Sequence, residues 1–222
     1  RVFPTFGARF YSEMVGNDKY WRYFFTVGYG PLKLEEFKIG DTPVSAFEDV
    51  EMEVRQGYPD DEPHTLYTKE IREEQLNILL TAANGWQQRT TRPECDEIIT
   101  DFGCPRGLTT FGSGADRIET TVRVEVQYSP AGQNVWAPPV WEGTDAHLAS
   151  GGLIVITDNS TSPVSRGGRW KVPKGQYDVR FRRITADATS SQVLDIVYAT
   201  MLRSVKSDNP VKIVGESTIV LR

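Results

Sequence analysis

The sequence predicts a mainly β protein, in which a β-sandwich is inserted into a small β domain. Two observations predict this class. Short runs of alternating apolar and polar residues are separated by Gly, Pro, Asn and Ser, and no helical period of apolar residues persists beyond about ten residues. The composition agrees, because 11% of the residues are aromatic, and 13 prolines and 19 glycines can end many short strands.

The first third of the chain is expected to form three strands joined by turns. Residues 23–27 are aromatic and β-branched, and residues 28–31 supply the backbone freedom of Gly and the fixed φ of Pro that a tight reversal needs. A hairpin with residues 32–39 is therefore expected, with a β-bulge at Glu35-Glu36. Residues 50–54 alternate apolar and acidic side chains and predict a third strand.

The remaining strands predict a sandwich. Within it, Pro173-Lys174-Gly175 followed by residues 177–181 is similar to the penultimate strand of fibronectin type III-like sandwiches. Residues 121–128 place three valines on one face and polar side chains on the other, and further apolar runs follow up to Met201. Asn84-Gly85 predicts a type I′ hairpin between the flanking runs. Residues 68–74 predict one short helical turn, because a Thr precedes three glutamates.

Two breaks in the pattern suggest the domain boundaries. Residues 59–63 place three acidic residues between prolines, as in a linker, and Asp208-Asn209-Pro210 interrupts the last strands. We therefore expect residues 1–65 together with 207–222 to form one discontinuous β domain, and residues 66–206 to form the inserted sandwich. The closing run is expected to pair with the opening strands, because an unpaired apolar strand would be an aggregation-prone edge.

Four short segments of the sequence resemble phage tail proteins of the tip attachment, or host-specificity, protein J type. They are VGYGPL at residues 27–32, KIGDTP at 38–43, FEDVE at 47–51 and WKVPKGQYDVRFRR at 170–183. The resemblance implies a structural component of the distal tail tip of a long-tailed phage or prophage. In that family the central tail hub links the tail tube to the receptor-binding tip and frames the DNA channel.

The same resemblance implies partners and a location. It implies a homotrimer that contacts the distal tail protein and other tail-tip proteins, in a virion tail assembled from chains made in the bacterial host cytoplasm. The sequence lacks an initiating Met and ends within an apolar run, so a piece of a longer protein is expected. The family places receptor recognition in a C-terminal part, so this sequence does not identify the host or the receptor.

Charge and cysteine content exclude several classes of function. The formal net charge of -5 gives no bulk basic surface, so direct sequence-specific binding of nucleic acid is not expected. No apolar run approaches the roughly 20 residues that span a membrane. Cys95 and Cys104 are too few for a disulfide framework or a closed zinc site, and two unpaired thiols are expected.

No residues are predicted to be catalytic, to ligate a metal or to bind a cofactor, so an enzyme is not expected. His64 and His147 are the only histidines, both in polar segments, and are expected to be solvent-exposed. An irregular opening segment carries four aromatic residues that are predicted to contact another subunit. These residues are Phe3, Phe6, Phe10 and Tyr11.

Two interpretations of other side chains remain open. An alternative to the tail-hub function is a carbohydrate- or ligand-binding module, in which Trp136 and Trp141 would stack on sugar rings. The other interpretation of these two tryptophans is that they belong to the sandwich core. The second open interpretation concerns a cluster of arginines, which forms either an anion-binding face or an ordinary charged outer face of a sheet. These are Arg166, Arg169, Arg180, Arg182 and Arg183.

Overall fold

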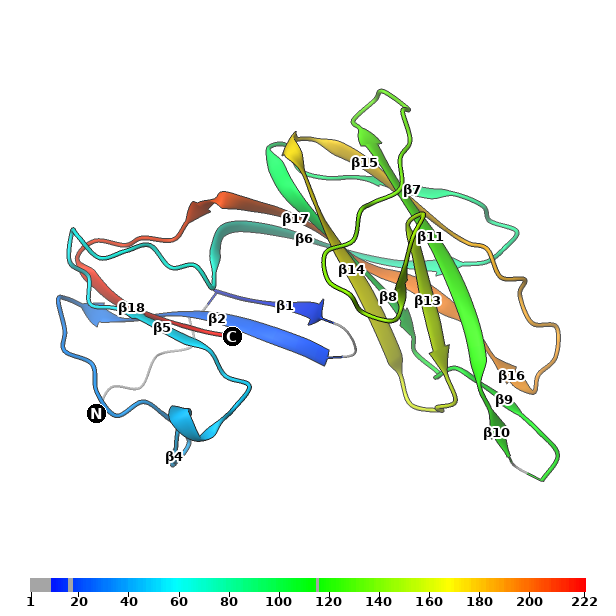
Figure 1. Ribbon diagram of the computed structural model, residues 1–222, viewed down its shortest axis with the longest axis horizontal. Helices are drawn as coiled ribbons and strands as arrows, with labels where there is room; N and C mark the ends of the chain where they lie inside the picture. Colours follow the sequence, from blue (N-terminus) through cyan, green and yellow to red (C-terminus); the bar gives the residue numbers. More distant parts are fainter. Residues whose placement is uncertain (1–8, 16–17, 115) are drawn as a thin grey trace. The chain divides into compact units, whose positions relative to one another are not determined.

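The computed structural model describes residues 9–15, 18–114 and 116–222, and almost all of its regular structure is β-strand (Figure 1). The only helical element among these residues is the short 3-10 turn η1, Val44–Ala46. The chain divides into two compact units. Unit 1 contains the described residues up to Glu13, Lys19–Glu70 and Ser207–Arg222, and unit 2 contains Ile71–Lys206 together with the described residues of Met14–Asp18. The mainly β class is thus confirmed.

Unit 1 is built on a four-stranded sheet that joins both ends of the chain. Its strands, in spatial order, are β1 (Arg9–Val15), β2 (Asp18–Tyr29), β18 (Glu216–Leu221) and β5 (Met52–Arg55). The closing strand β18 pairs antiparallel with β2 on one side and with β5 on the other. This is the pairing that was expected of the closing run. Whether the two units fold as separate domains stays a prediction.

The hairpin predicted after β2 is wrong. The next strands, β3 (Lys38–Ile39) and β4 (Thr42–Pro43), pair only with each other, and Glu36 adopts a positive φ of 56° in place of a bulge. Gly30 serves close packing, because a Cβ there would lie 2.5 Å from the carbonyl oxygen of Gln56. Its N–H donates to the carbonyl oxygen of Gly215 at 2.9 Å, which holds this turn against the sheet. The opening segment is also less irregular than expected, since β1 and β2 begin at residues 9 and 18.

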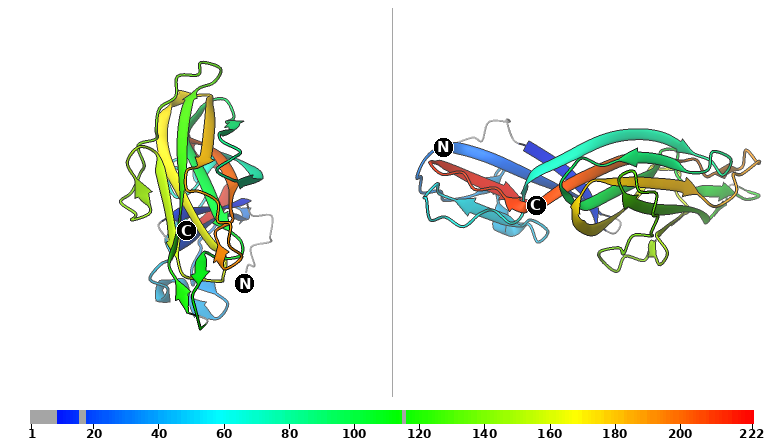
Figure 2. Two further views of the ribbon diagram at one scale, coloured as in Figure 1. Left: turned by 90° about the vertical axis from the view of Figure 1, so that its right-hand side faces the viewer. Right: turned by 90° about the horizontal axis from the view of Figure 1, so that it is seen from above.

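Unit 2 is a β-sandwich of two sheets (Figures 1 and 2). The first sheet has the order β14 (Val164–Gly175), β8 (Cys95–Cys104), β17 (Val197–Pro210), β6 (Thr68–Leu80). The second has the order β12 (Leu148–Ala149), β13 (Leu153–Asp158), β11 (Thr120–Pro130), β15 (Tyr177–Arg183), β7 (Gln87–Thr90). A smaller sheet has the order β10 (Arg117–Ile118), β9 (Thr109–Phe111), β16 (Val193–Leu194).

The core of unit 2 comes from alternating side chains of both sheets. Val122, Val124 and Val126 of β11 are fully buried, as their period-two spacing predicts. Phe102 of β8 meets Phe181 of β15 in a T-shaped contact with 5.8 Å between ring centroids. The predicted inserted segment therefore has the sandwich architecture expected of it.

Three local predictions for the chain after residue 66 are wrong. Residues 68–74 belong to strand β6, because its neighbour β17 supplies backbone partners that outweigh a weak helical start. The Asn84-Gly85 turn joins β6 to β7 in the other sheet, and only Gly85 has a positive φ, whereas a type I′ turn needs two. Asp208-Asn209-Pro210 does not break β17, which continues to Pro210; a Pro is tolerated at the end of a strand.

Candidate functional site

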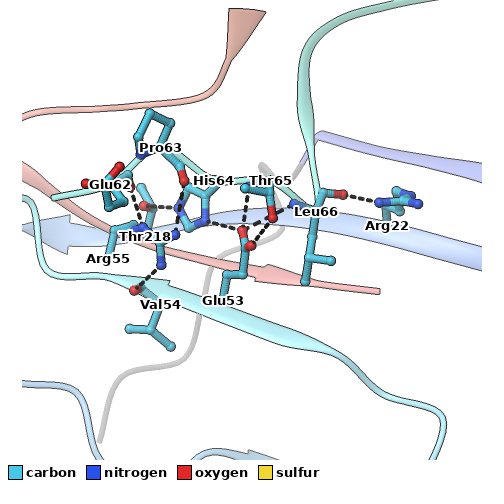
Figure 3. A network of polar contacts seen from close by, with 10 residues as sticks. All are labelled: Arg22, Glu53, Val54, Arg55, Glu62, Pro63, His64, Thr65, Leu66 and Thr218. Carbon is cyan, nitrogen blue, oxygen red and sulfur yellow. Dashed lines mark hydrogen bonds and ion pairs between the residues drawn. The ribbon is translucent and has the colours of Figure 1, made fainter. Parts of the chain in front are cut away.

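A polar network in unit 1 is centred on the buried side chain of His64 (Figure 3). The Nε2 atom of His64 lies 2.7 Å from Oγ1 of Thr218 in β18, and its Nδ1 atom lies 3.3 Å from Oε2 of Glu53 in β5. The edge of the ring meets Phe24 of β2, with 5.7 Å between centroids. One side chain therefore contacts three strands of the sheet.

The same network satisfies the backbone at the end of the predicted linker, residues 59–63, and just after it. Glu53 accepts hydrogen bonds from the N–H groups of Thr65 at 2.8 Å and Leu66 at 3.2 Å. Arg55 donates to the carbonyl oxygens of Glu62 and Pro63, the latter at 3.0 Å, and Arg22 donates to that of Leu66 (Figure 3). Residues 62–66 are thus held against the sheet by charged side chains of its strands.

The electrostatics fix the protonation states of this network. Burial lowers the pKa of His64, Arg55 lowers it further, and the adjacent Glu53 opposes both. Burial raises the pKa of Glu53, but hydrogen bonds from Thr65, Leu66 and His64 outweigh it and lower the pKa overall. A neutral His64 donates its Nδ1–H to the Glu53 carboxylate, so its Nε2 accepts from the hydroxyl of Thr218.

Glu53, His64 and Thr218 have the residue types and order of a nucleophilic triad. His64 is 0% exposed and Thr218 is 1% exposed, so a substrate cannot reach the hydroxyl. The network is therefore a structural clamp. The expectation that both histidines are exposed is wrong, since His147 is also buried and its Nε2 lies 2.8 Å from the carbonyl oxygen of Gly167.

A second feature of unit 1 is a row of four aromatic rings on one face of its sheet, which we call the aromatic row. Phe10 of β1 lies 5.8 Å from Trp21, Trp21 lies 6.2 Å from Tyr23, and Tyr23 lies 5.8 Å from Phe25, as centroid distances. Phe10 is 60% exposed and Trp21 is 40% exposed. The period-two spacing of residues 21, 23 and 25 was visible in the sequence, but it was interpreted only as a strand.

The aromatic row continues into an apolar face of the same sheet. Leu221 is the direct cross-strand partner of Tyr23, and Ile219 is that of Phe25, so these side chains share a face. Of the residues predicted as an interface, Phe10 lies in the row. Phe3, Phe6 and the side chain of Tyr11 lie outside the described parts of the chain.

The two tryptophans proposed to stack on sugars have different environments. Trp141 packs against Trp170 in a T-shaped contact with 5.5 Å between centroids, and its Nε1–H donates to the carbonyl oxygen of Ala149 at 3.1 Å. It borders the core of unit 2. Trp136 is half-buried, and the guanidinium carbon of Arg180 lies 4.0 Å from the centre of its ring.

The five clustered arginines do not form a single anion-binding face. Four are paired with carboxylates: Arg166 with Asp158, Arg169 with Glu97, Arg182 with Glu125 and Arg183 with Asp195. Arg180 and Arg182 lie on the outer face of β15, next to Trp86. Of the five, Arg180 is the candidate for binding an anion.

The two cysteines, metal-ligating side chains and apolar helices are the remaining features that could mark a site. Cys95 and Cys104 are unpaired, as predicted. Both are buried, and burial raises the pKa of the Cys104 thiol to about 11. In residues 9–15, 18–114 and 116–222, no group of three His, Cys, Asp or Glu side chains is arranged to hold a metal ion. No helix in this part of the chain is long and apolar enough to span a membrane.

The fold and these features define a β-sandwich protein with a structural clamp and an exposed aromatic face. The family model of the tip attachment protein J FNIII-A domain matches residues 70–208, so the chain belongs to this family of phage tail proteins. This confirms the resemblance seen in the sequence and gives the chain a structural role in the phage tail tip. No curated protein matches the chain.

Proposed function

We propose that the chain is part of the central tail hub of a long-tailed phage or prophage. There it links the tail tube to the receptor-binding tip and frames the DNA channel. The exposed aromatic row of unit 1 supports this proposal, because a hub protein must present apolar surface to its neighbours. The family match of unit 2 supports the location in the tail tip.

The aromatic row is proposed to be the interface with a second copy in a homotrimer. Tryptophan and other aromatic side chains contribute much of the binding energy at protein interfaces when partners cover them. Phe3, Phe6 and Tyr11 are proposed to extend this surface from the opening segment. The distal tail protein and other tail-tip proteins would bind elsewhere on the assembled homotrimer.

Charge insertion into the aromatic row tests the interface. We expect the full chain to form trimers in mass photometry, and Trp21→Glu and Phe10→Glu to yield monomers with an unchanged circular dichroism spectrum. Ile118→Glu is the matched control, because Ile118 is an exposed apolar strand residue of unit 2. Trimers that survive both changes in the row, or a wild-type chain that stays monomeric, would refute this interface.

The two units are proposed to be separate folding domains, with residues 66–206 inserted between residues 1–65 and 207–222. The position of β18 between β2 and β5 supports this, since both neighbours lose a partner without it. We expect deletion of residues 211–222 to remove hydrogen-exchange protection from Phe24 and Val54 while Val124 keeps it. Equal loss of protection in both units would contradict two domains.

We infer that the chain has no catalytic activity and no direct role in binding nucleic acid sequences. The burial of the His64 and Thr218 side chains and the formal charge of -5 support this inference. Synthesis in the host cytoplasm agrees with two unpaired thiols. Hydrolysis of cell-wall or capsule polymers by the purified chain, abolished by Glu53→Gln, would contradict it.

The alternative of a carbohydrate-binding module has less support. One ring face of Trp136 is covered by Arg180, and Trp141 packs against Trp170, so the two rings offer no shared platform. Glycan-array binding that is lost in Trp136→Ala would favour this alternative over the hub.

A further inference from the structure

Arg180 occupies an unusual position on the outer face of the second sheet of unit 2. Its neighbours Val179 and Phe181 are buried in the core, so its side chain projects to the opposite side. The guanidinium carbon lies 4.2 Å from the centre of the Trp86 ring and 4.0 Å from that of the Trp136 ring. The two indoles come from different loops, and both make cation–π contacts with Arg180; Trp86 also contacts Arg182, at 4.4 Å.

The hydrogen bonds of Arg180 leave its charge uncancelled. Its Nε and Nη2 atoms donate to the side-chain oxygen of Gln127 in β11, at 3.1 and 2.6 Å. A guanidinium has five N–H donors, so about three remain for other acceptors. Within the described residues no carboxylate lies within 4.0 Å of Arg180, and the group that orients it is a neutral amide.

The carboxylates on the same face of the sheet are already engaged. Glu125 lies 2.7 Å from Nη2 of Arg182, the next outward residue of β15. Asp178 accepts hydrogen bonds from Thr90 at 2.6 Å and from the N–H of Gly132 at 2.7 Å. Arg180 therefore presents a fixed positive charge on a chain whose formal net charge is -5.

We propose that Arg180, held between Trp86 and Trp136, is a binding site for a carboxylate on an acidic segment of a partner protein. A planar guanidinium matches the two oxygens of a carboxylate, and its fixed position lowers the entropy lost on binding. A protein partner fits the surroundings, because Val135, which precedes Trp136 in the same loop, is 67% exposed and offers an apolar contact. This site does not depend on the hub proposed for unit 1.

Titration of the full chain with hexaglutamate tests the proposal. In NMR spectra at low salt, we expect hexaglutamate to shift the indole N–H signals of Trp86 and Trp136 saturably, and hexaglutamine to leave them unchanged. Arg180→Gln should raise the Kd at least tenfold. Arg180→Lys, which keeps the charge but loses the planar fork, should raise it at least fivefold. Arg123→Gln is the matched control on the same face and should change the Kd less than twofold.

Three results would overturn the proposal. The first is the absence of shifts at these two indoles, and the second is an equal loss of binding in Arg180→Gln and Arg123→Gln. The third is tighter binding of inorganic phosphate or of an acidic oligosaccharide such as oligogalacturonate, which would assign the site to another anion. Unchanged backbone amide spectra confirm that each variant is folded. If Arg180→Gln does not fold, the Kd of Arg180→Lys tests the proposal instead.

Discussion

The buried ion pairs of Arg203 give the sharpest prediction for the stability of the sandwich. Arg203 in β17 is 1% exposed, and it donates to Asp101 of β8 at 2.6 Å and to Glu73 of β6 at 2.7 Å. It therefore joins its strand to both neighbouring strands in the sheet. Arg203→Met keeps an apolar stem of similar length but leaves the Asp101 carboxylate, which is also buried, without its cation.

Removing one partner of a buried pair costs about 3–5 kcal/mol, which corresponds to a fall in Tm of about 10–15 °C for a domain of this size. Adding Asp101→Asn to Arg203→Met should recover part of the loss, because the uncompensated charge is gone. Urea unfolding followed by the fluorescence of buried Trp170 measures these differences.

Arg182→Met is the matched control for this experiment. Arg182 also pairs with a carboxylate, Glu125, but its side chain is 41% exposed, so its loss should cost less than about 1 kcal/mol. If Arg203→Met costs no more than Arg182→Met, the pairing of Arg203 with Asp101 and Glu73 does not stabilise the sheet as argued.

Two further predictions follow from the titratable groups. Burial, and then Arg55, lowers the pKa of His64, so its contribution to stability is complete above its unfolded pKa of about 6.5 and is lost as the pH falls below that value. His64→Gln should flatten the fall in unit 1 stability between pH 7 and 5.5, and an unchanged slope would refute a neutral His64 facing Glu53, Arg55 and Asp61. Burial raises the pKa of Cys104 to about 11, so an aromatic disulfide reagent at pH 8 should react with it only as fast as unit 2 opens; immediate reaction in the folded chain would contradict this.

Local patterns predicted the strands that are stabilised by their own periodicity. The three valines at positions 122, 124 and 126 identified both β11 and its buried face, since alternation alone requires a sheet with one apolar side. The pairing of β18 with β2 and β5 followed from a similar argument, because an apolar run at the end of a chain needs strand partners.

Features that depend on distant partners were not visible in the sequence. His64 contacts Glu53 and Thr218, which are 11 and 154 residues away, so nothing near it indicated burial. The predicted linker carries the signature of a loop, yet its backbone is satisfied by charged side chains of the sheet. Arg180 was singled out for its charge, but its two indole neighbours come from loops about 90 and 40 residues before it.

The location of the chain in the virion tests the central claim most directly. Gold-labelled antibodies against unit 2 can be bound to intact particles of the parent phage and viewed by electron microscopy. If the chain is a structural part of the tail tip, the label should lie at the end of the tail distal to the capsid. Label along the tail tube or on the capsid, or tails of normal structure without the protein, would contradict this account.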